Sequence, residues 1–239
     1  LTELLCRYED VFSREEYDLG TFTAIKHQID TGNAKPIRQP ARRTPITFQS
    51  EEVEYLQKQL DAGVVVPSSS AWASPVVLVR KKDGGVRWCV DYRRVNEITQ
   101  KDAYPLPKIG ECLDTLSGSR LFSTLDLLSG YHQFEVDKRD RPKTAFITRH
   151  GLFEYTRMPF GLCNAPSTFQ RGMELVLRGL QWAILLIYLD DVIITGKTFH
   201  EHLNNLGEVL SRFRQFGLKL KPTKCNLFKE EVLFLGHVV

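Results

Sequence analysis

Three aspartates are the residues of this sequence with the clearest capacity for chemistry. Asp126 follows one apolar stretch, and Asp190 and Asp191 form an adjacent pair between two others. Clustered carboxylates repel one another, and a divalent cation relieves that repulsion. Hard oxygen ligands select Mg²⁺ or Mn²⁺ over zinc, and two such ions about 4 Å apart can promote phosphoryl transfer. The aspartates therefore predict a two-metal site, provided that the fold brings them together.

The Asp190-Asp191 pair is weak evidence by itself, because Asp-Asp in a hairpin turn usually serves only the turn. Here the pair follows Tyr188-Leu189 and joins two fully apolar segments, residues 183–188 and 192–195. Apolar runs of this length are typical of buried strands. Because Asp126 is also expected beside the pair, a role in forming the turn alone is a poor explanation for Asp190 and Asp191.

The elements that must position the aspartates follow a recognisable order. We expect strand, helix, strand, strand, helix and strand at residues 121–125, 164–180, 183–188, 192–195, 200–216 and 232–238. Leaving out an intervening hairpin at 144–157, this order is the split βαβ arrangement of an α+β fold. Its first and third strands are antiparallel neighbours at the centre of the sheet. The end of the first strand then lies beside the turn between the second and third, so all three carboxylates meet at one edge.

The earlier part of the chain predicts a second set of elements. Residues 47–61 have helical spacing of apolar side chains, and a short helix is expected between Ile109 and Gly118. Strands at 76–80 and 86–90 flank Lys82-Asp83-Gly84-Gly85, a strong hairpin signal. Its basic side chains are expected at the tip and flanks of the hairpin.

Composition limits the class of protein. With 42% apolar and 26% charged residues among 239, the chain is typical of a soluble globular protein. No apolar run approaches the roughly 20 residues that span a bilayer, so no membrane partner is expected. Five scattered cysteines without a Cys-x-x-Cys pair argue against a disulfide framework or a structural zinc site. The net charge is only +3, but the cations are clustered, as in a groove that neutralises phosphates; solvated loop charge is the alternative for any one cluster.

Several motifs resemble those of reverse transcriptases, and their wording is closest to Gypsy-type LTR retrotransposons. Tyr188-Leu189-Asp190-Asp191 is similar to the signature turn of that family, and residues 125–131 (LDLLSGY) resemble its first carboxylate motif. Further matches follow in the family's order: residues 79–85 (VRKKDGG), 91–96 (DYRRVN), 158–162 (MPFGL) and 234–237 (FLGH). The resemblance covers roughly residues 27–239. It implies an RNA-directed DNA polymerase with the fingers and palm of a right-hand fold, the palm being the split βαβ sheet with helices on one face.

The resemblance also implies roles for individual residues. Asp126, Asp190 and Asp191 match the catalytic, metal-binding carboxylates, with the backbone carbonyl of Leu127 as a further ligand; two Mg²⁺ ions are expected, with Mn²⁺ as a substitute. The residues matching nucleotide contacts are Lys81, Arg87, Tyr131 and Phe160. Lys82 rivals Lys81 for the triphosphate, and Phe160 stands where retroviral relatives carry glutamine. The residues matching primer and template contacts are Tyr188, Leu235, Gly236 and His237.

The family's organisation suggests a division of the chain and a larger setting. We expect a leader at residues 1–45, fingers at 46–101 and 133–163, and palm at 102–132 and 164–239. Both ends look cut, as in a piece of a Pol polyprotein that also carries protease, ribonuclease H and integrase, with the thumb following residue 239. Expected partners are RNA and DNA template-primer, deoxynucleoside triphosphates and the rest of the polyprotein. The expected location is the cytoplasm, in retrotransposon particles, and the nucleus at integration.

Other classes of function remain to be weighed. A palm polymerase that copies RNA into RNA is disfavoured by Tyr131, whose ring would reject a ribose 2′-hydroxyl. A split βαβ module that only binds RNA would display aromatics on its central strands, whereas residues 184–187 are Ile-Leu-Leu-Ile. A domesticated, inactive relic is the third alternative, and the intact carboxylate set gives it no support.

Overall fold

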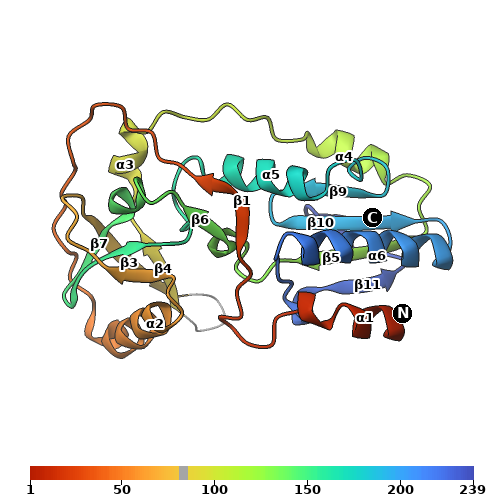
Figure 1. The fold of residues 1–239 in the computed structure, drawn as a ribbon, viewed down its shortest axis with the longest axis horizontal. Coiled ribbons are helices and arrows are strands. Elements are labelled where there is room, and N and C mark those ends of the chain that lie inside the picture. Colours follow the sequence, from red (N-terminus) through yellow and green to blue (C-terminus); the bar gives the residue numbers. More distant parts are fainter. Residues whose placement is uncertain (81–85) are drawn as a thin grey trace. The chain divides into compact units, whose positions relative to one another are not determined.

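The structure is a computed structural model that describes residues 1–80 and 86–239. By its internal contacts the chain divides into two compact units (Figure 1). Unit 1 combines residues 1–25, 103–133 and 166–239, and unit 2 combines residues 26–102 and 134–165. None of the helices in the described part of the chain is long and apolar enough to cross a membrane.

Unit 1 is built on a four-stranded antiparallel sheet in the order β11-β5-β10-β9. Its strands are β5 (Leu121–Asp126), β9 (Leu185–Tyr188), β10 (Asp191–Gly196) and β11 (Asn226–Lys229). The first and third strands of the predicted pattern, β5 and β10, are the central antiparallel pair, from Gly196 opposite Leu121 to Asp191 opposite Asp126. The split βαβ prediction is therefore confirmed in the part that matters for the carboxylates.

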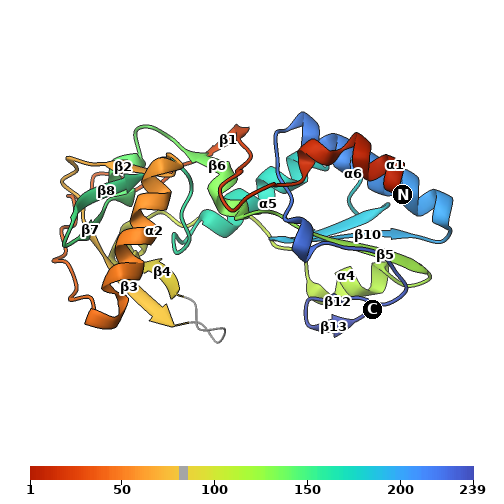
Figure 2. The same cartoon turned by 90° about the horizontal axis from the view of Figure 1, so that it is seen from below.

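The two faces of this sheet carry different layers. Figure 2 shows α1 and α6 on one side and α4 with strands β12 and β13 on the other. The remaining elements of unit 1 are α1 (Thr2–Arg7), η1 (Glu9–Val11), α4 (Ile109–Thr115), η3 (Gly130–Gln133), α5 (Ala165–Val176), α6 (Phe199–Gln215), η5 (Pro222–Lys224), β12 (Leu233–Phe234) and β13 (His237–Val238), with β1 (Phe22–His27) crossing the boundary between the units.

The predicted last strand, at 232–238, is wrong. Residues 233–238 form instead a tight hairpin of β12 and β13, with Leu235 and Gly236 at positive φ in its turn. The fourth strand of the sheet is β11, which pairs with β5 across an irregular register. A turn residue such as Gly236 breaks an otherwise apolar strand pattern. The strand β11 has only four residues, Asn-Leu-Phe-Lys, and is too short to show a strand pattern of its own.

The first 25 residues, for which the sequence indicates no element, are packed onto unit 1. Leu220 receives a backbone hydrogen bond from Ser13 and donates one to Val11, both 2.8 Å long. The guanidinium of Arg214, near the end of α6, pairs with Asp10 and stacks over the ring of Tyr8. These contacts hold the first residues of the chain against unit 1, beside Leu220 and the end of α6.

Unit 2 contains a five-stranded sheet in the order β2-β8-β7-β3-β4. Its elements are η2 (Ile46–Phe48), α2 (Gln49–Asp61), β2 (Val65–Pro67), β3 (Ser74–Arg80), β4 (Val86–Val90), α3 (Arg93–Ile98), β6 (Phe134–Val136), η4 (Arg141–Thr144), β7 (Phe146–Thr148) and β8 (Gly151–Tyr155). The predicted strands at 76–80 and 86–90 are confirmed as β3 and β4, paired from Val76–Val90 to Arg80–Val86. The turn predicted at 82–85 lies outside the described residues.

Candidate active site

The acidic edge of unit 1 is formed where β5 ends and β10 begins. Asp126 is the last residue of β5, Asp191 is the first of β10, and their Cα atoms are direct partners across the antiparallel pair. Because side chains alternate along a strand, Asp126 lies on the same face as Phe122, and Asp191 on the same face as Ile193. Phe122 and Ile193 belong to the core cluster beneath α4 and β12. The two carboxylates therefore share that face, opposite the one covered by α6.

The acidic edge carries unrelieved negative charge. Loss of hydration raises the pKa of Asp190 to about 6, and repulsion from Asp126 and Asp191 adds to the shift. Loss of hydration also raises the pKa of Asp191, followed by repulsion from Asp126. Lys224 lowers both values without cancelling the rise. The three carboxylates thus need more positive charge than the neighbouring lysine provides.

Lys224 is a member of the site that sequence reasoning did not place there. Its Nζ lies 3.1 Å from Oδ2 of Asp126, and the Lys221 N–H donates to the Asp126 carbonyl at 2.9 Å. The sequence marks residues 219–224 only as one of several basic clusters. The pairing depends on how the chain returns past β5 after α6, and no local pattern indicates that return.

The chemistry of the donor set fits a hard divalent cation, since it consists of carboxylate oxygens beside a strand end. Within residues 1–80 and 86–239, no three His, Cys, Asp or Glu side chains are grouped closely enough to hold one ion together. Asp126 is turned toward Lys224, so closing the ligand set requires side-chain rotation at this position. Leu127 is buried and its backbone bridges to Leu220.

The turn that carries Asp190 has an unusual backbone. Leu189 adopts a φ of 52°, in the left-handed region that glycine favours. A leucine there costs of order 1 kcal/mol or more. The surrounding structure must therefore hold this turn in place.

Tyr131 lies close to the acidic edge. Its side chain is 8% exposed, and its ring centroid is 5.1 Å from that of Phe169 on α5. Burial raises the pKa of its hydroxyl well above the usual range, and the charge of Asp190 adds to the shift. Gly130 allows this packing, because a Cβ there would lie 3.0 Å from the Phe169 ring. The structure thus places Tyr131 with the aspartates and also packs it into the core.

The other residues expected to contact the nucleotide, Arg87 and Lys81 at the triphosphate and Phe160 at the nucleotide pocket, belong to unit 2. Arg87 lies on β4, opposite Val79, and is exposed. Phe160 is 51% exposed. Lys81 and its rival Lys82 lie outside the described residues. Arg87 and Phe160 thus belong to unit 2, whereas Asp126, Asp190 and Asp191 belong to unit 1.

The residues expected to contact the primer lie on the α4 side of the unit 1 sheet. Tyr188 and Leu235 pack against the core cluster that includes Phe234. Gly236 forms the turn of the β12–β13 hairpin, and His237 is exposed at its far side. These residues therefore share a face of the sheet with Asp126 and Asp191.

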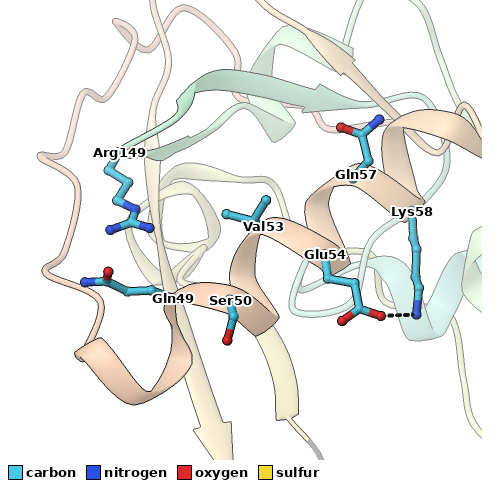
Figure 3. Close-up of a pocket in the computed structure, with 7 residues that line it drawn as sticks. All are labelled: Gln49, Ser50, Val53, Glu54, Gln57, Lys58 and Arg149. Atoms are coloured by element: carbon cyan, nitrogen blue, oxygen red, sulfur yellow. Dashed lines mark ion pairs between the residues drawn. The ribbon is translucent and has the colours of Figure 1, made fainter.

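A separate surface hollow lies on unit 2, along the outer side of α2 (Figure 3). It is lined by Gln49, Ser50, Val53, Glu54, Gln57, Lys58 and Arg149. Glu54 and Lys58 pair within it at 2.8 Å. None of the predicted site residues lines this hollow. The ion pair between Glu54 and Lys58, four residues apart on α2, is typical of a helix face exposed to solvent.

Comparison with known proteins identifies the family of the chain and supports the fold described above. Residues 79–239 match the family described as reverse transcriptase (RNA-dependent DNA polymerase). This chain belongs to the reverse transcriptase family. The Pol polyprotein of transposon 297 of Drosophila melanogaster is 39% identical over the whole chain, and that of transposon gypsy is 35% identical over 99% of it. The chain spans only 23% and 24% of those two relatives.

Solved structures agree with the assignment of this reverse transcriptase. A foamy viral protease-reverse transcriptase in complex with an RNA/DNA hybrid superposes with a TM-score of 0.91 and 26% identity. The match covers 99% of this chain and 32% of that one. The predicted α+β polymerase fold and the Gypsy-type resemblance are confirmed.

Proposed function

We propose that this reverse transcriptase adds deoxynucleotides to a primer 3′ end, on an RNA or a DNA template, by two-metal phosphoryl transfer. The observation that carries the proposal is the pairing of Asp126 with Asp191 across β5 and β10. Together with Asp190 these residues concentrate negative charge that residues 1–80 and 86–239 do not neutralise. Such an arrangement is costly for a structural role and suits cation binding.

Asp126, Asp190 and Asp191 would hold the ions, Mg²⁺ or Mn²⁺, with the Leu127 carbonyl as a further ligand. Bound metal supplies activation of the primer hydroxyl and stabilisation of the leaving oxygen. Lys224, now paired with Asp126, keeps this carboxylate in place before an ion binds. Its cation also offsets part of the negative charge of a triphosphate.

The nucleotide and the primer contact other residues of the proposed site. Arg87, with Lys81 or Lys82, would bind the triphosphate, and Tyr131 would lie beneath the incoming sugar, with Phe160 at the nucleotide pocket. Tyr188 and residues 235–237 would contact the primer end. A solved relative in complex with an RNA/DNA hybrid supports a nucleic-acid duplex as the partner.

The relatives are polyproteins, and we propose the same setting here, with ribonuclease H, protease and integrase on the parent chain and a cytoplasmic particle as the location. The inactive-relic and RNA-binding alternatives would give binding without synthesis.

Primer extension tests the proposal. A DNA primer annealed to an RNA template is incubated with the protein, deoxynucleotides and Mg²⁺ or Mn²⁺. We expect extension that EDTA abolishes and that Asp126→Asn removes while the fold is kept. Binding of the duplex without any extension by the wild-type protein would favour a relic instead.

A further inference from the structure

Gln170 on α5 connects the core of unit 1 to the turn that carries Asp190. Its side chain is completely buried. Its Oε1 accepts a hydrogen bond from the Leu189 N–H at 2.8 Å, and its Nε2 donates to Oε1 of Glu174 at 2.8 Å. A weaker contact of 3.5 Å joins Nε2 to the carbonyl of Ile187. One amide thus links α5 to the end of β9 and to the first residue of the turn that follows it.

The turn requires support of this kind. Leu189 has a φ of 52°, a strained conformation for a residue with a Cβ. Its N–H points inward to Gln170 and immediately precedes Asp190 in the chain. A turn free to relax would move the Asp190 side chain, and displacement of a reacting group by about 1 Å can cost about 10²-fold in rate.

Glu174 determines which way the Gln170 amide points. An ionised carboxylate only accepts hydrogen bonds, so the Nε2 end of Gln170 must face Glu174. The Oε1 end then faces Leu189, which needs an acceptor. The second oxygen of Glu174 accepts from the hydroxyl of Tyr104, whose ring lies 4.6 Å from the Arg171 guanidinium carbon. Leu189 therefore donates to Gln170 and Gln170 donates to Glu174, while Tyr104 donates to the other oxygen of Glu174, so the carboxylate is the common acceptor of the network.

We propose that Gln170 is a positioning residue that fixes the backbone of the Asp190-Asp191 turn, and that Glu174 and Tyr104 set its orientation. This inference rests on the proposed function, because it concerns the metal-binding edge. Gln170 does not touch the reacting atoms; it acts through Leu189. A glutamine with only a structural role would use these hydrogen bonds to satisfy its own buried amide, and the conformation of the turn would not depend on it.

An exchange of partners separates the two possibilities. Gln170→Glu keeps the acceptor for Leu189 but sets two carboxylates against each other. Adding Glu174→Gln restores a donor between positions 170 and 174, an acceptor for Tyr104 and the same net charge. We expect Gln170→Glu and the isosteric Gln170→Met to lower kcat at least ~10-fold with little change in primer KM, and the double variant to recover to within ~3-fold of wild type.

Hydrogen exchange of the Leu189 amide provides a readout that needs neither metal nor activity. We expect exchange at least ~10-fold faster in both single variants, near wild type in the double variant, and unchanged at amides within α5. Gln215→Met, at the exposed end of α6, is the matched control and should change neither measurement. Unaltered Leu189 exchange, or a double variant no better than Gln170→Glu, would overturn the proposal.

Failure of the proposed function would look different. A wild-type protein with no extension activity and with Mn²⁺ affinity unaffected by Asp126→Asn would refute the metal site. The Leu189 exchange pattern would still decide whether Gln170 holds the turn. If Gln170→Met fails to fold, the charge-conserving exchange between positions 170 and 174 remains the test.

Discussion

Two aspartates, one in each unit, show opposite electrostatic settings. Asp91 in unit 2 pairs with Arg93 at 2.7 Å and with Arg42 at 2.6 Å. Hydrogen bonding to Arg93 is the main cause that lowers the pKa of Asp91 to about 2. In unit 1, loss of hydration and neighbouring carboxylates raise the pKa of Asp190 to about 6.

Under the proposed function, this difference separates a structural carboxylate, Asp91, from a metal-binding one, Asp190. Asp91 is satisfied by cations that the chain itself supplies. Of the three aspartates at the acidic edge, Asp126 forms an ion pair with Lys224, whose charge lowers the pKa of Asp190 and Asp191 without cancelling the repulsion among the carboxylates. In the proposed function, a bound cation balances this remaining charge.

Removing the charge of Asp190 should affect activity far more than removing the charge of Asp91. Asp190→Asn keeps the shape but weakens cation binding, so we expect at least ~10³-fold loss in nucleotide incorporation with the fold intact. Asp91→Asn should keep the rate within a few-fold. Single-turnover kinetics measure the rates, and circular dichroism reports the fold. Near-normal extension by folded Asp190→Asn protein would remove the metal-site assignment.

The ring of Tyr131, near Asp190 in unit 1, is expected to exclude ribonucleotides. If it lies beneath the sugar, a ribose 2′-hydroxyl would overlap it, at a cost of about 1–3 kcal/mol or roughly 5- to 150-fold in selectivity. Tyr131→Ala should admit ribonucleotides, and Tyr131→Phe should change little, because bulk does the excluding. The measurement is kcat/KM for matched ribo- and deoxynucleotides. A wild type that uses both equally has no such gate; because Tyr131 also packs on Phe169, unfolding of Tyr131→Ala would indicate a core role.

Stability should respond to Asp91→Asn where activity does not. The carboxylate is largely buried but its arginine partners are exposed, so we expect a loss of about 1–2 kcal/mol at pH 7. The folded pKa lies below the unfolded value, so this contribution is complete above about pH 4 and fades as pH falls toward 2. Urea unfolding of both proteins at several pH values measures it. An equal difference at every pH would point to lost packing instead of lost charge.

The opposite sign is expected for metal-free Asp190. Its folded pKa lies above the unfolded value, so ionisation destabilises the protein as pH rises from about 4 to about 6. Part of the Asp190 side chain remains accessible to water, which screens its charge, so we expect this ionisation to destabilise the protein by only about 1 kcal/mol. In EDTA, Asp190→Asn should match wild type near pH 4 and exceed its unfolding free energy by that amount at pH 7.5. A wild type that is the more stable protein at pH 7.5 would contradict the raised pKa.

The sequence predicts the elements that carry strong local patterns. The apolar strands β9 and β10, the amphipathic α6 and the placement of Asp126 beside Asp191 follow from periodicity and fold topology. The short edge strand β11 could not be predicted, because its conformation depends on pairing with β5 rather than on its own four residues. The contact of Gln170 with Leu189 likewise joins positions that no spacing rule connects.

The discontinuity of unit 1 has a consequence for biosynthesis. Every residue of unit 2 has been added once residue 165 is made, whereas β11 is completed only at residue 229. At about 5–20 residues per second, the nascent chain waits roughly 3–13 s between those points. Throughout that interval one edge of β5 has no partner strand. The strand that ends in Asp126 is therefore an exposed site for chaperone capture or misassembly while the chain is still being translated.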